Sequence, residues 1–298
     1  MAHINGILLI DKPPGPTSHD IVNIVRRWSD QRRVGHAGTL DPAATGLLVI
    51  LLGQATRLSF WVMGADKTYE GVIRFGIATD TLDADGSEVG REPCRFSNAR
   101  LRPAVEGLTG EITQIPPRYS AVKVGGSAAY KTARAGGEPK IPERQVRIDS
   151  FEVGEIVPGD FPSVTFKVDC SSGTYIRSLA ADLGTAIGCF AHLESLRRTR
   201  VGRFTLEAGV TLDELRGLGR EEAPLVLMKD ALDLPQYHAP VEELPLLLTG
   251  RAVPGPGEVV SLGEGAVVKI IADDDGELLG LGRIKEGKLK PFLVVRET

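Results

Sequence analysis

The segment of residues 32–53, RRVGHAGTLDPAATGLLVILLG, most constrains how this chain can fold. Its last part holds six consecutive apolar residues between two glycines, which predicts a short buried strand over residues 47–52. Proline disfavours the α conformation in the residue before it and suits the first turn of a helix. Asp41 is therefore expected to be extended, and residues 42–45 to form a short helix. The sequence thus places a carboxylate at a stiff corner, beside a glycine loop that carries the imidazole of His36.

Asp41 has two interpretations. An aspartate before proline is commonly a helix N-cap and needs no other purpose. Its neighbours favour a functional role, because two glycines, His36 and the basic pair of residues 32–33 share its loop. Taken together, GHAGTLDPAATGLL resembles the signature of the TruB family of tRNA pseudouridine synthases. The resemblance implies that Asp41 is the catalytic nucleophile and that His36 helps to displace the target base.

Two more motifs resemble the same family. The stretch GILLIDKPPGPTS, residues 6–18, resembles its first motif, in which Lys12 and Pro13 support the catalytic loop, and we expect Lys12 at the substrate site. The stretch KTYEG alternates like a strand, which by itself predicts only that Tyr69 is an aromatic residue in a sheet. In the family this tyrosine stacks on the target uracil, so the same role is expected of Tyr69.

A third motif lies in the second half of the chain. CSSGTYIRSLAADLG, residues 170–184, resembles the family motif that brings a tyrosine and an arginine to the active site. The matching residues are Tyr175 and Arg177, although an arginine at a helix start is ordinarily a surface residue. Leu196 matches the apolar residue that the family places against the uracil pocket.

The chemistry implied by the family accounts for these residue types. Turning uridine into pseudouridine breaks the N1–C1′ bond, turns the uracil and joins C5 to C1′, so we expect no cofactor. A carboxylate can trap or stabilise a cationic sugar, or attack the base, but only when it is ionised; Arg177 is the expected partner that favours the charged form of Asp41. Extruding the base costs a few kcal/mol. His36 would fill the vacancy while Tyr69 and Leu196 sandwich the uracil.

The net charge of −4 gives no overall sign of nucleic-acid binding, but charge is unevenly distributed. Residues 1–210 hold 25 basic and 23 acidic residues, whereas residues 211–298 hold 10 basic and 16 acidic ones. A phosphate-binding surface is therefore expected on the first two-thirds of the chain. One candidate is the cluster of four arginines within residues 197–203, of which Arg197, Arg198 and Arg200 are hypothesised to contact phosphates. The alternative is a solvated basic face.

Metal sites are not expected. The three cysteines show no CxxC spacing, which argues against zinc and a disulfide framework and favours a reducing cytoplasm. Residues 79–92 partly match the calcium-binding loop of an EF-hand, since Asp83 and Asp85 stand at the spacing of its ligands. Thr81 stands at the first ligand position, where the motif requires aspartate, so calcium is not expected. Asp85-Gly86 is better explained as a hairpin turn.

Periodicity and turn residues predict most of the secondary structure. Helices are expected over residues 19–28, capped by Thr17 or Ser18, and over residues 98–108, 177–188 and 244–250. Strands are expected over residues 6–10, 67–73, 163–170, 259–262, 266–271, 278–284 and 291–295. Residues 114–145 resemble a thumb-like insertion that grips RNA in the family, the alternative being a solvated loop.

The resemblance implies an α+β pseudouridine synthase fold with a mixed, largely antiparallel sheet flanked by helices. Prolines near residues 232–240 predict a domain boundary, which gives a catalytic domain over residues 1–234 and a small C-terminal β-barrel, similar to PUA domains, over residues 235–298. The apolar run of residues 7–10 is too short for a signal peptide or a membrane span.

The expected partner is tRNA, modified at uridine 55 of the T-loop. The enzyme is expected to be a cytoplasmic monomer that needs neither a protein partner nor a guide RNA. Two alternatives remain open: an RNA-binding or folding module without catalysis, and a guide-RNA-dependent relative. The self-contained insertion and the lack of a long basic tail favour the stand-alone enzyme.

Overall fold

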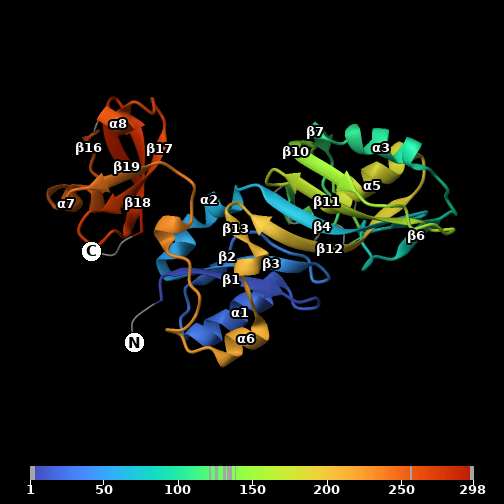
Figure 1. Cartoon of the computed structure of the whole chain (residues 1–298), viewed down its shortest axis with the longest axis horizontal. Helices are drawn as coiled ribbons and strands as arrows, with labels where there is room; N and C mark the ends of the chain where they lie inside the picture. Colours follow the sequence, from blue (N-terminus) through green and yellow to red (C-terminus); the bar gives the residue numbers. More distant parts are fainter. Residues whose placement is uncertain are drawn as a thin grey trace.

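The computed structural model describes residues 4–120, 122–124, 127–129, 132, 136–137, 139–255 and 257–295. Its centre is a ten-stranded sheet in the order β14-β1-β3-β12-β4-β11-β10-β7, with β2 paired to β3 and β13 to β12. The strands are β1 (Gly6–Lys12), β2 (Val34–His36), β3 (Thr45–Leu52), β4 (Lys67–Phe75), β7 (Gly110–Gln114), β10 (Arg144–Val153), β11 (Ser163–Cys170), β12 (Ala191–Val201), β13 (Phe204–Thr205) and β14 (Val210–Thr211). Figure 1 shows this sheet running across the molecule.

The sheet is mixed and largely antiparallel, as predicted. The pairs β1–β14 and β3–β12 are parallel. The other pairs within this sheet, among them β1–β3, β12–β4 and β11–β4, are antiparallel. Because β12 lies between β3 and β4, residues from the two halves of the chain meet at the centre of the sheet.

Strand β3 is buried on both faces, which explains why its sequence is a continuous apolar run rather than an alternating one. Leu48, Ile50 and Leu52 belong to the hydrophobic cluster on one face. Leu47, Val49 and Leu51 belong to the cluster on the other face. The strand predicted over residues 47–52 is thereby confirmed.

Helices cover the sheet in two groups. In Figure 1, α1 (Ser18–Ser29) and α6 (Leu212–Gly217) lie beside β1 and β3, and α3 (Asn98–Glu106) and α5 (Ile176–Ile187) lie beside β10 and β11. Thr17 caps α1 and forms a capping box with Asp20, as expected for the predicted helix start. Helix α5 ends at Gly188, which has a φ of 82°.

The loop of residues 37–44, here called the Asp41 loop, connects β2 to β3 and differs from the prediction. It contains no helix, and β3 begins at Thr45. The carbonyl oxygens of Pro42 and Ala44 accept hydrogen bonds from the Lys12 ammonium. That contact, together with the positive φ of 94° at Gly46, holds the segment in a non-helical path.

Residues 79–92 form the predicted hairpin region, with β5 (Ile77–Thr79) paired to β6 (Glu88–Arg91). The predicted thumb-like insertion is described only in part, because residues 121, 125–126, 130–131, 133–135 and 138 lie outside the described residues. Its described part contains β8 (Lys123–Val124) and β9 (Ser127–Ala128). Short helices occur at η1 (Gly53–Leu58) and α2 (Ser59–Met63) and at η2 (Leu206–Ala208) and η3 (Met228–Asp230). No helix in the described parts of the chain is long and apolar enough to cross a membrane.

The C-terminal part forms a curled five-stranded sheet in the order β15-β17-β18-β19-β16. Its strands and helices are β15 (Gln236–Ala239), β16 (Val253–Pro254), β17 (Val267–Ala272), β18 (Leu278–Lys285), β19 (Lys288–Val294), η4 (Val241–Glu243), α7 (Leu244–Leu248) and α8 (Gly257–Val260). The strand predicted over residues 259–262 is wrong, because Val259 lies in α8 and packs into the apolar core of this unit.

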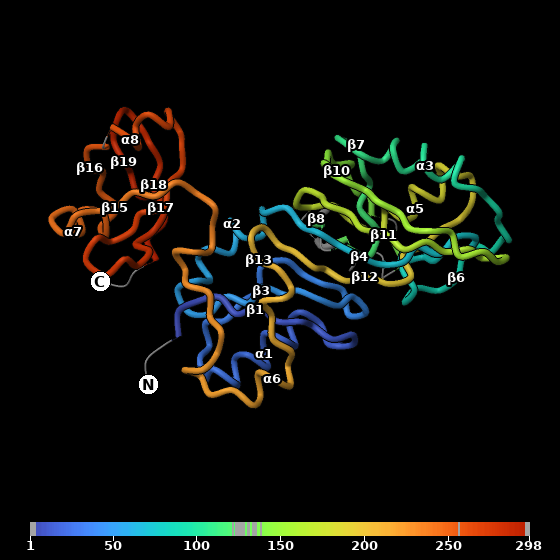
Figure 2. Tube along the Cα trace, viewed as in Figure 1, coloured from blue at the N-terminus to red at the C-terminus, as the bar shows by residue number. Residues whose placement is uncertain are grey.

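The C-terminal sheet is set apart from the main sheet in Figure 2, and the chain reaches it past α2. The two parts nevertheless share a hydrophobic cluster, in which Ile271, Leu278 and Leu281 pack with residues of β1 and β3. Trp61 of α2 also lies near Phe292 of β19, with ring centroids 5.9 Å apart.

Candidate active site

The Asp41 loop is held by buried polar side chains from β1 and α1. Lys12 has no exposed surface, and its ammonium donates to the carbonyl oxygens of Pro42 at 2.9 Å and Ala44 at 2.7 Å. The Ser18 hydroxyl donates to the carbonyl of Leu40 at 2.9 Å and accepts from its N–H at 2.8 Å. Both contacts act on residues next to or near Asp41, so they fix the corner that carries its carboxylate.

Arg198 of β12 holds the same loop from the opposite side. Its guanidinium is buried and donates to three backbone carbonyls, those of Leu47 (2.8 Å), Gly38 (3.0 Å) and Thr39 (3.3 Å). The contact requires close approach of two strands: a Cβ atom at Gly46 would lie 2.3 Å from the backbone oxygen of Arg198. Glycine at this position therefore permits the β3–β12 junction.

The expected ion pair between Asp41 and Arg177 is present. The Nη2 atom of Arg177 lies 3.2 Å from Oδ2 of Asp41. The arginine side chain is 8% exposed, whereas the carboxylate is 45% exposed and so remains accessible to a substrate. The first turn of α5 positions the guanidinium, and the Asp41 loop positions the carboxylate.

Arg177 is fixed by further partners that sequence reasoning missed. Its Nη1 atom lies 3.4 Å from Oδ2 of Asp83. Its guanidinium also donates to the carbonyl oxygens of Thr81 at 3.0 Å and Tyr119 at 3.1 Å. Asp83, which the sequence analysis considered only as part of a partial calcium-loop match and a turn, is thus a second carboxylate beside the candidate site.

The electrostatic balance at Asp41 differs from the simple expectation. Burial raises the pKa of its carboxyl above the ordinary value, and the positive charge of Arg177 offsets part of that rise. The nearby negative charges of Asp83 and Asp85 raise the pKa further. Arg177 therefore favours the ionised form, as expected, but burial and like charge outweigh it.

Tyr69 lies on β4, directly opposite Arg198 of β12 and Val168 of β11. Its side chain is 8% exposed and belongs to the apolar cluster beneath α5. Burial raises the pKa of its phenol, and a hydrogen bond from Arg198 together with the charge of that residue offsets part of the rise. The negative charge of Asp41 also raises the pKa of this phenol.

His36 closes the other side of the Asp41 loop, at the end of β2. Its Nδ1 atom is buried and has no hydrogen-bond partner among the described residues. Burial and the positive charges of Arg198 and His19 lower the pKa of its imidazole. Both causes favour the uncharged form of the ring.

The remaining candidates occupy neighbouring strands and helices. Leu196 is partly buried on β12 opposite Gly71 and packs against the main apolar cluster. Tyr175 precedes α5 by one residue, and its N–H donates to the side chain of Gln114 at 2.7 Å. Its ring lies under the guanidinium of Arg144, 5.5 Å from the ring centroid.

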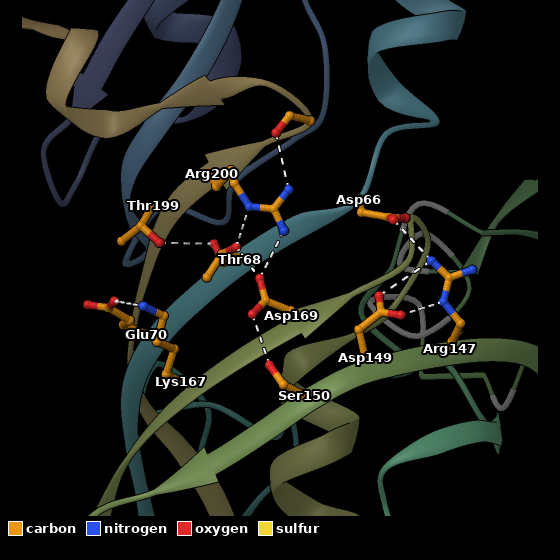
Figure 3. Close-up of polar contacts among 11 residues, drawn as sticks. Asp66, Thr68, Glu70, Arg147, Asp149, Ser150, Lys167, Asp169, Thr199 and Arg200 are labelled. Carbon is orange, nitrogen blue, oxygen red and sulfur yellow. Dashed lines mark hydrogen bonds and ion pairs between the residues drawn. The ribbon is translucent and has the colours of Figure 1, made fainter. Parts of the chain in front are cut away.

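Three of the four clustered arginines bind groups of the protein itself, and the phosphate hypothesis is wrong for one of them, Arg198. Arg198 is 1% exposed and cannot reach a phosphate. Arg197 pairs with Asp11 at 2.6 Å, and Arg200 pairs with Asp169 at 2.9 Å. Figure 3 shows Arg200 in a network of polar side chains that spans β12, β4, β11 and β10.

Two family models match the chain. Residues 26–176 match the TruB family pseudouridylate synthase N-terminal domain, and residues 177–243 match the tRNA pseudouridylate synthase B C-terminal domain. The first match contains the Asp41 loop, Tyr69 and Tyr175. The second begins at Arg177.

Curated relatives match over nearly the whole length. A tRNA pseudouridine synthase B of Aromatoleum aromaticum is 43% identical over 98% of this chain and 93% of its own length. One of Thermobifida fusca is 42% identical over 97% of this chain and 98% of its own.

Solved structures share the fold. A chain of a Cbf5–Nop10–Gar1 complex matches with a TM-score of 0.73 at 27% identity, covering 98% of this chain and 85% of that one. A chain of an H/ACA RNP bound to a substrate RNA containing 2′-deoxyuridine matches with a TM-score of 0.71 at 25% identity, again covering 98% and 85%.

Proposed function

The chain belongs to the TruB family of pseudouridylate synthases, and we propose that it converts uridine 55 in the T-loop of tRNA into pseudouridine. The relatives named tRNA pseudouridine synthase B support tRNA as the substrate. The observation that carries the proposal is the ion pair of Asp41 and Arg177, at 3.2 Å, on a loop fixed by Lys12, Ser18 and Arg198.

The reaction rearranges bonds within one nucleotide. The N1–C1′ bond of uridine breaks, the uracil turns, and a C5–C1′ bond forms. A proton leaves C5 and a proton is gained at N1, so the atoms balance without an external donor. The protein must expose the base, hold it during rotation, stabilise charge on the sugar or base, and move these protons.

Each candidate residue has a place in that sequence. Asp41 supplies the anion that acts on the target nucleotide, and Arg177 favours its ionised form and orients it. His36 occupies the space that the extruded base leaves. Tyr69 and Leu196 hold the two faces of the uracil.

Two residues act beside this group. Tyr175 completes the wall at the start of α5, where its backbone is fixed by Gln114. Lys12 has no exposed surface, so it serves the substrate through the carbonyls of the Asp41 loop rather than by contact.

The organisation of the chain follows from the same proposal. Residues 1–234 form the catalytic domain, with the insertion of residues 114–145 gripping the RNA, and residues 235–298 form a PUA-like domain. The enzyme acts in the cytoplasm as a monomer, without a guide RNA or a protein partner. Its acidic C-terminal part makes the first domain the main source of phosphate contacts.

The test is to map pseudouridine in an unmodified tRNA transcript after incubation with the purified protein. Product is expected at position 55 without added RNA or protein. The matched control is Asp41→Asn, which keeps the shape of the side chain but cannot be an anion; it should form no product and bind tRNA within a few-fold of the wild type. Product at another position, a requirement for guide RNA, or turnover by the pure variant would each contradict the proposal.

A further inference from the structure

A large groove opens beside the candidate active site. Its volume is about 1010 Å³, at the upper end of the range for ligand pockets. One wall is α2 with the residues that follow it, another is the turn between β12 and β13, and a third is the segment of residues 231–234 that leads to the C-terminal sheet. Arg144 and residues 172–173 also line it.

One positively charged side chain that lines the groove has no partner among the described residues. Arg203, on the turn after β12, is exposed, and within the described parts of the chain its side chain makes neither a hydrogen bond nor an ion pair. Arg200, which also lines the groove, is bound to Asp169 and Thr68 (Figure 3). Of the four arginines of the 197–203 cluster, Arg203 alone has a side chain available for a ligand.

The part of the groove formed by α2 is aromatic and apolar although it faces solvent. Phe60 is 75% exposed and Met63 is 42% exposed. Phe60 meets Trp61 edge to face, with ring centroids 6.0 Å apart. Exposed apolar side chains gathered beside a hollow mark an interaction site.

Two side chains, those of Arg144 and Lys67, connect the residues that line the groove with residues of the candidate active site. Arg144 lies over the ring of Tyr175, and its Nε atom is buried without a hydrogen-bond partner among the described residues. The Lys67 ammonium donates to the backbone oxygens of Met63 and Ala65 in the groove wall. The same lysine packs beneath the Asp41 loop, since a Cβ at position 38 would lie 3.7 Å from its Cε.

We propose that this groove binds an unpaired segment of the substrate RNA outside the target nucleotide. Bases stack on Phe60 and Trp61, and phosphates pair with Arg203 and Arg144. Single-stranded RNA fits because aromatic rings and guanidinium groups line the same groove, the combination that recognises bases and backbone together. The inference rests on the proposed function, since it takes the RNA substrate from there.

The experiment measures the affinity of a fluorescently labelled, unmodified tRNA transcript over a series of salt concentrations. Arg203→Ala should remove one phosphate contact and lower the slope of log affinity against log salt by about 0.7–0.9. Phe60→Ala should weaken binding roughly five- to a hundredfold while leaving that slope unchanged, because stacking releases no counterions.

Matched controls separate this groove from general surface effects. Arg95→Ala removes an arginine that is 88% exposed, and Phe190→Ala removes a phenylalanine that is 44% exposed, both outside the groove. Thermal unfolding of all four variants checks that each is folded. Both groove variants must differ from their controls in the stated way.

The outcomes are distinct from those that test the reaction. If Arg203→Ala keeps the wild-type salt slope, or if Phe60→Ala binds tRNA as the wild type does, the proposal that the groove binds RNA is refuted. These are binding measurements, so they hold whether or not position 55 is modified. Conversely, if the wild-type enzyme modifies position 55 but the groove variants bind tRNA as the wild type does, only this inference is refuted.

Discussion

Arg198 of β12 lies directly opposite Tyr69 of β4, and its guanidinium ties the strand to the backbone of the Asp41 loop. One buried side chain thus connects the two groups proposed to act on the target nucleotide. The contact runs through backbone carbonyls, so it depends on the geometry of the guanidinium rather than on the identity of the loop residues.

Replacing Arg198 with lysine should therefore cost both stability and rate. An ammonium cannot reach three carbonyls in the directions that the guanidinium does. Leaving one or two buried acceptors unpaired should lower the free energy of unfolding by about 1–4 kcal/mol. Chemical denaturation and single-turnover rates would measure the two effects. Arg197→Lys, which alters the exposed neighbour paired with Asp11, is the control and should change little.

Asp41→Asn should raise the thermal stability at neutral pH while it abolishes turnover. Because the folded-state pKa of Asp41 is raised, its contribution to stability is fully present below the unfolded pKa and is lost as pH rises through the folded pKa. The asparagine amide does not titrate, so the variant does not lose this stability as the pH rises. Melting temperatures of both proteins between pH 4 and pH 8 would show the difference widening with pH. A variant that melts below the wild type at pH 8 would contradict the prediction.

Asp83→Asn should slow the reaction and shift its pH dependence. Arg177 would lose one of two carboxylates that hold it, and misplacement of such a group costs on the order of ten- to a hundredfold in rate. Asp41 would lose a neighbouring negative charge, so its pKa should fall. The acid limb of the pH–rate profile should therefore move to lower pH. Asp80→Asn, in the same hairpin, serves as the control.

The parts of this fold that were predictable have local causes. The buried strand β3 is a continuous apolar run because both of its faces are covered, and α1 begins at a capping box that four residues encode. The site residues Asp41, Tyr69 and Arg177 stood in motifs that could be recognised, although no periodicity would have brought them together.

The failures have non-local causes. Pro42 suits a helix start, but the Lys12 ammonium of β1 donates hydrogen bonds to the carbonyl oxygens of Pro42 and Ala44. Those oxygens would otherwise be available to helical N–H groups. The pairing of Asp83 with Arg177 joins residues far apart in sequence. The sequence around Asp83 indicates only a turn. Arg198 stands beside two other arginines of β12 that remain only partly buried. The register of β12 between β3 and β4, which the local sequence does not reveal, buries Arg198.

Tyr69 gives the clearest division between a packing role and a chemical one. Burial raises the pKa of its phenol, which opposes proton transfer, while Arg198 directly opposite favours the phenolate. If the phenol takes or relays the C5 proton, Tyr69→Phe should bind tRNA normally and turn over about a hundred- to ten-thousandfold more slowly. Tyr69→Leu should be slower still, because it also removes the face on which the uracil stacks. Single-turnover rates at saturating enzyme separate this chemistry from binding, and a near-wild-type rate for Tyr69→Phe would leave the ring with stacking alone.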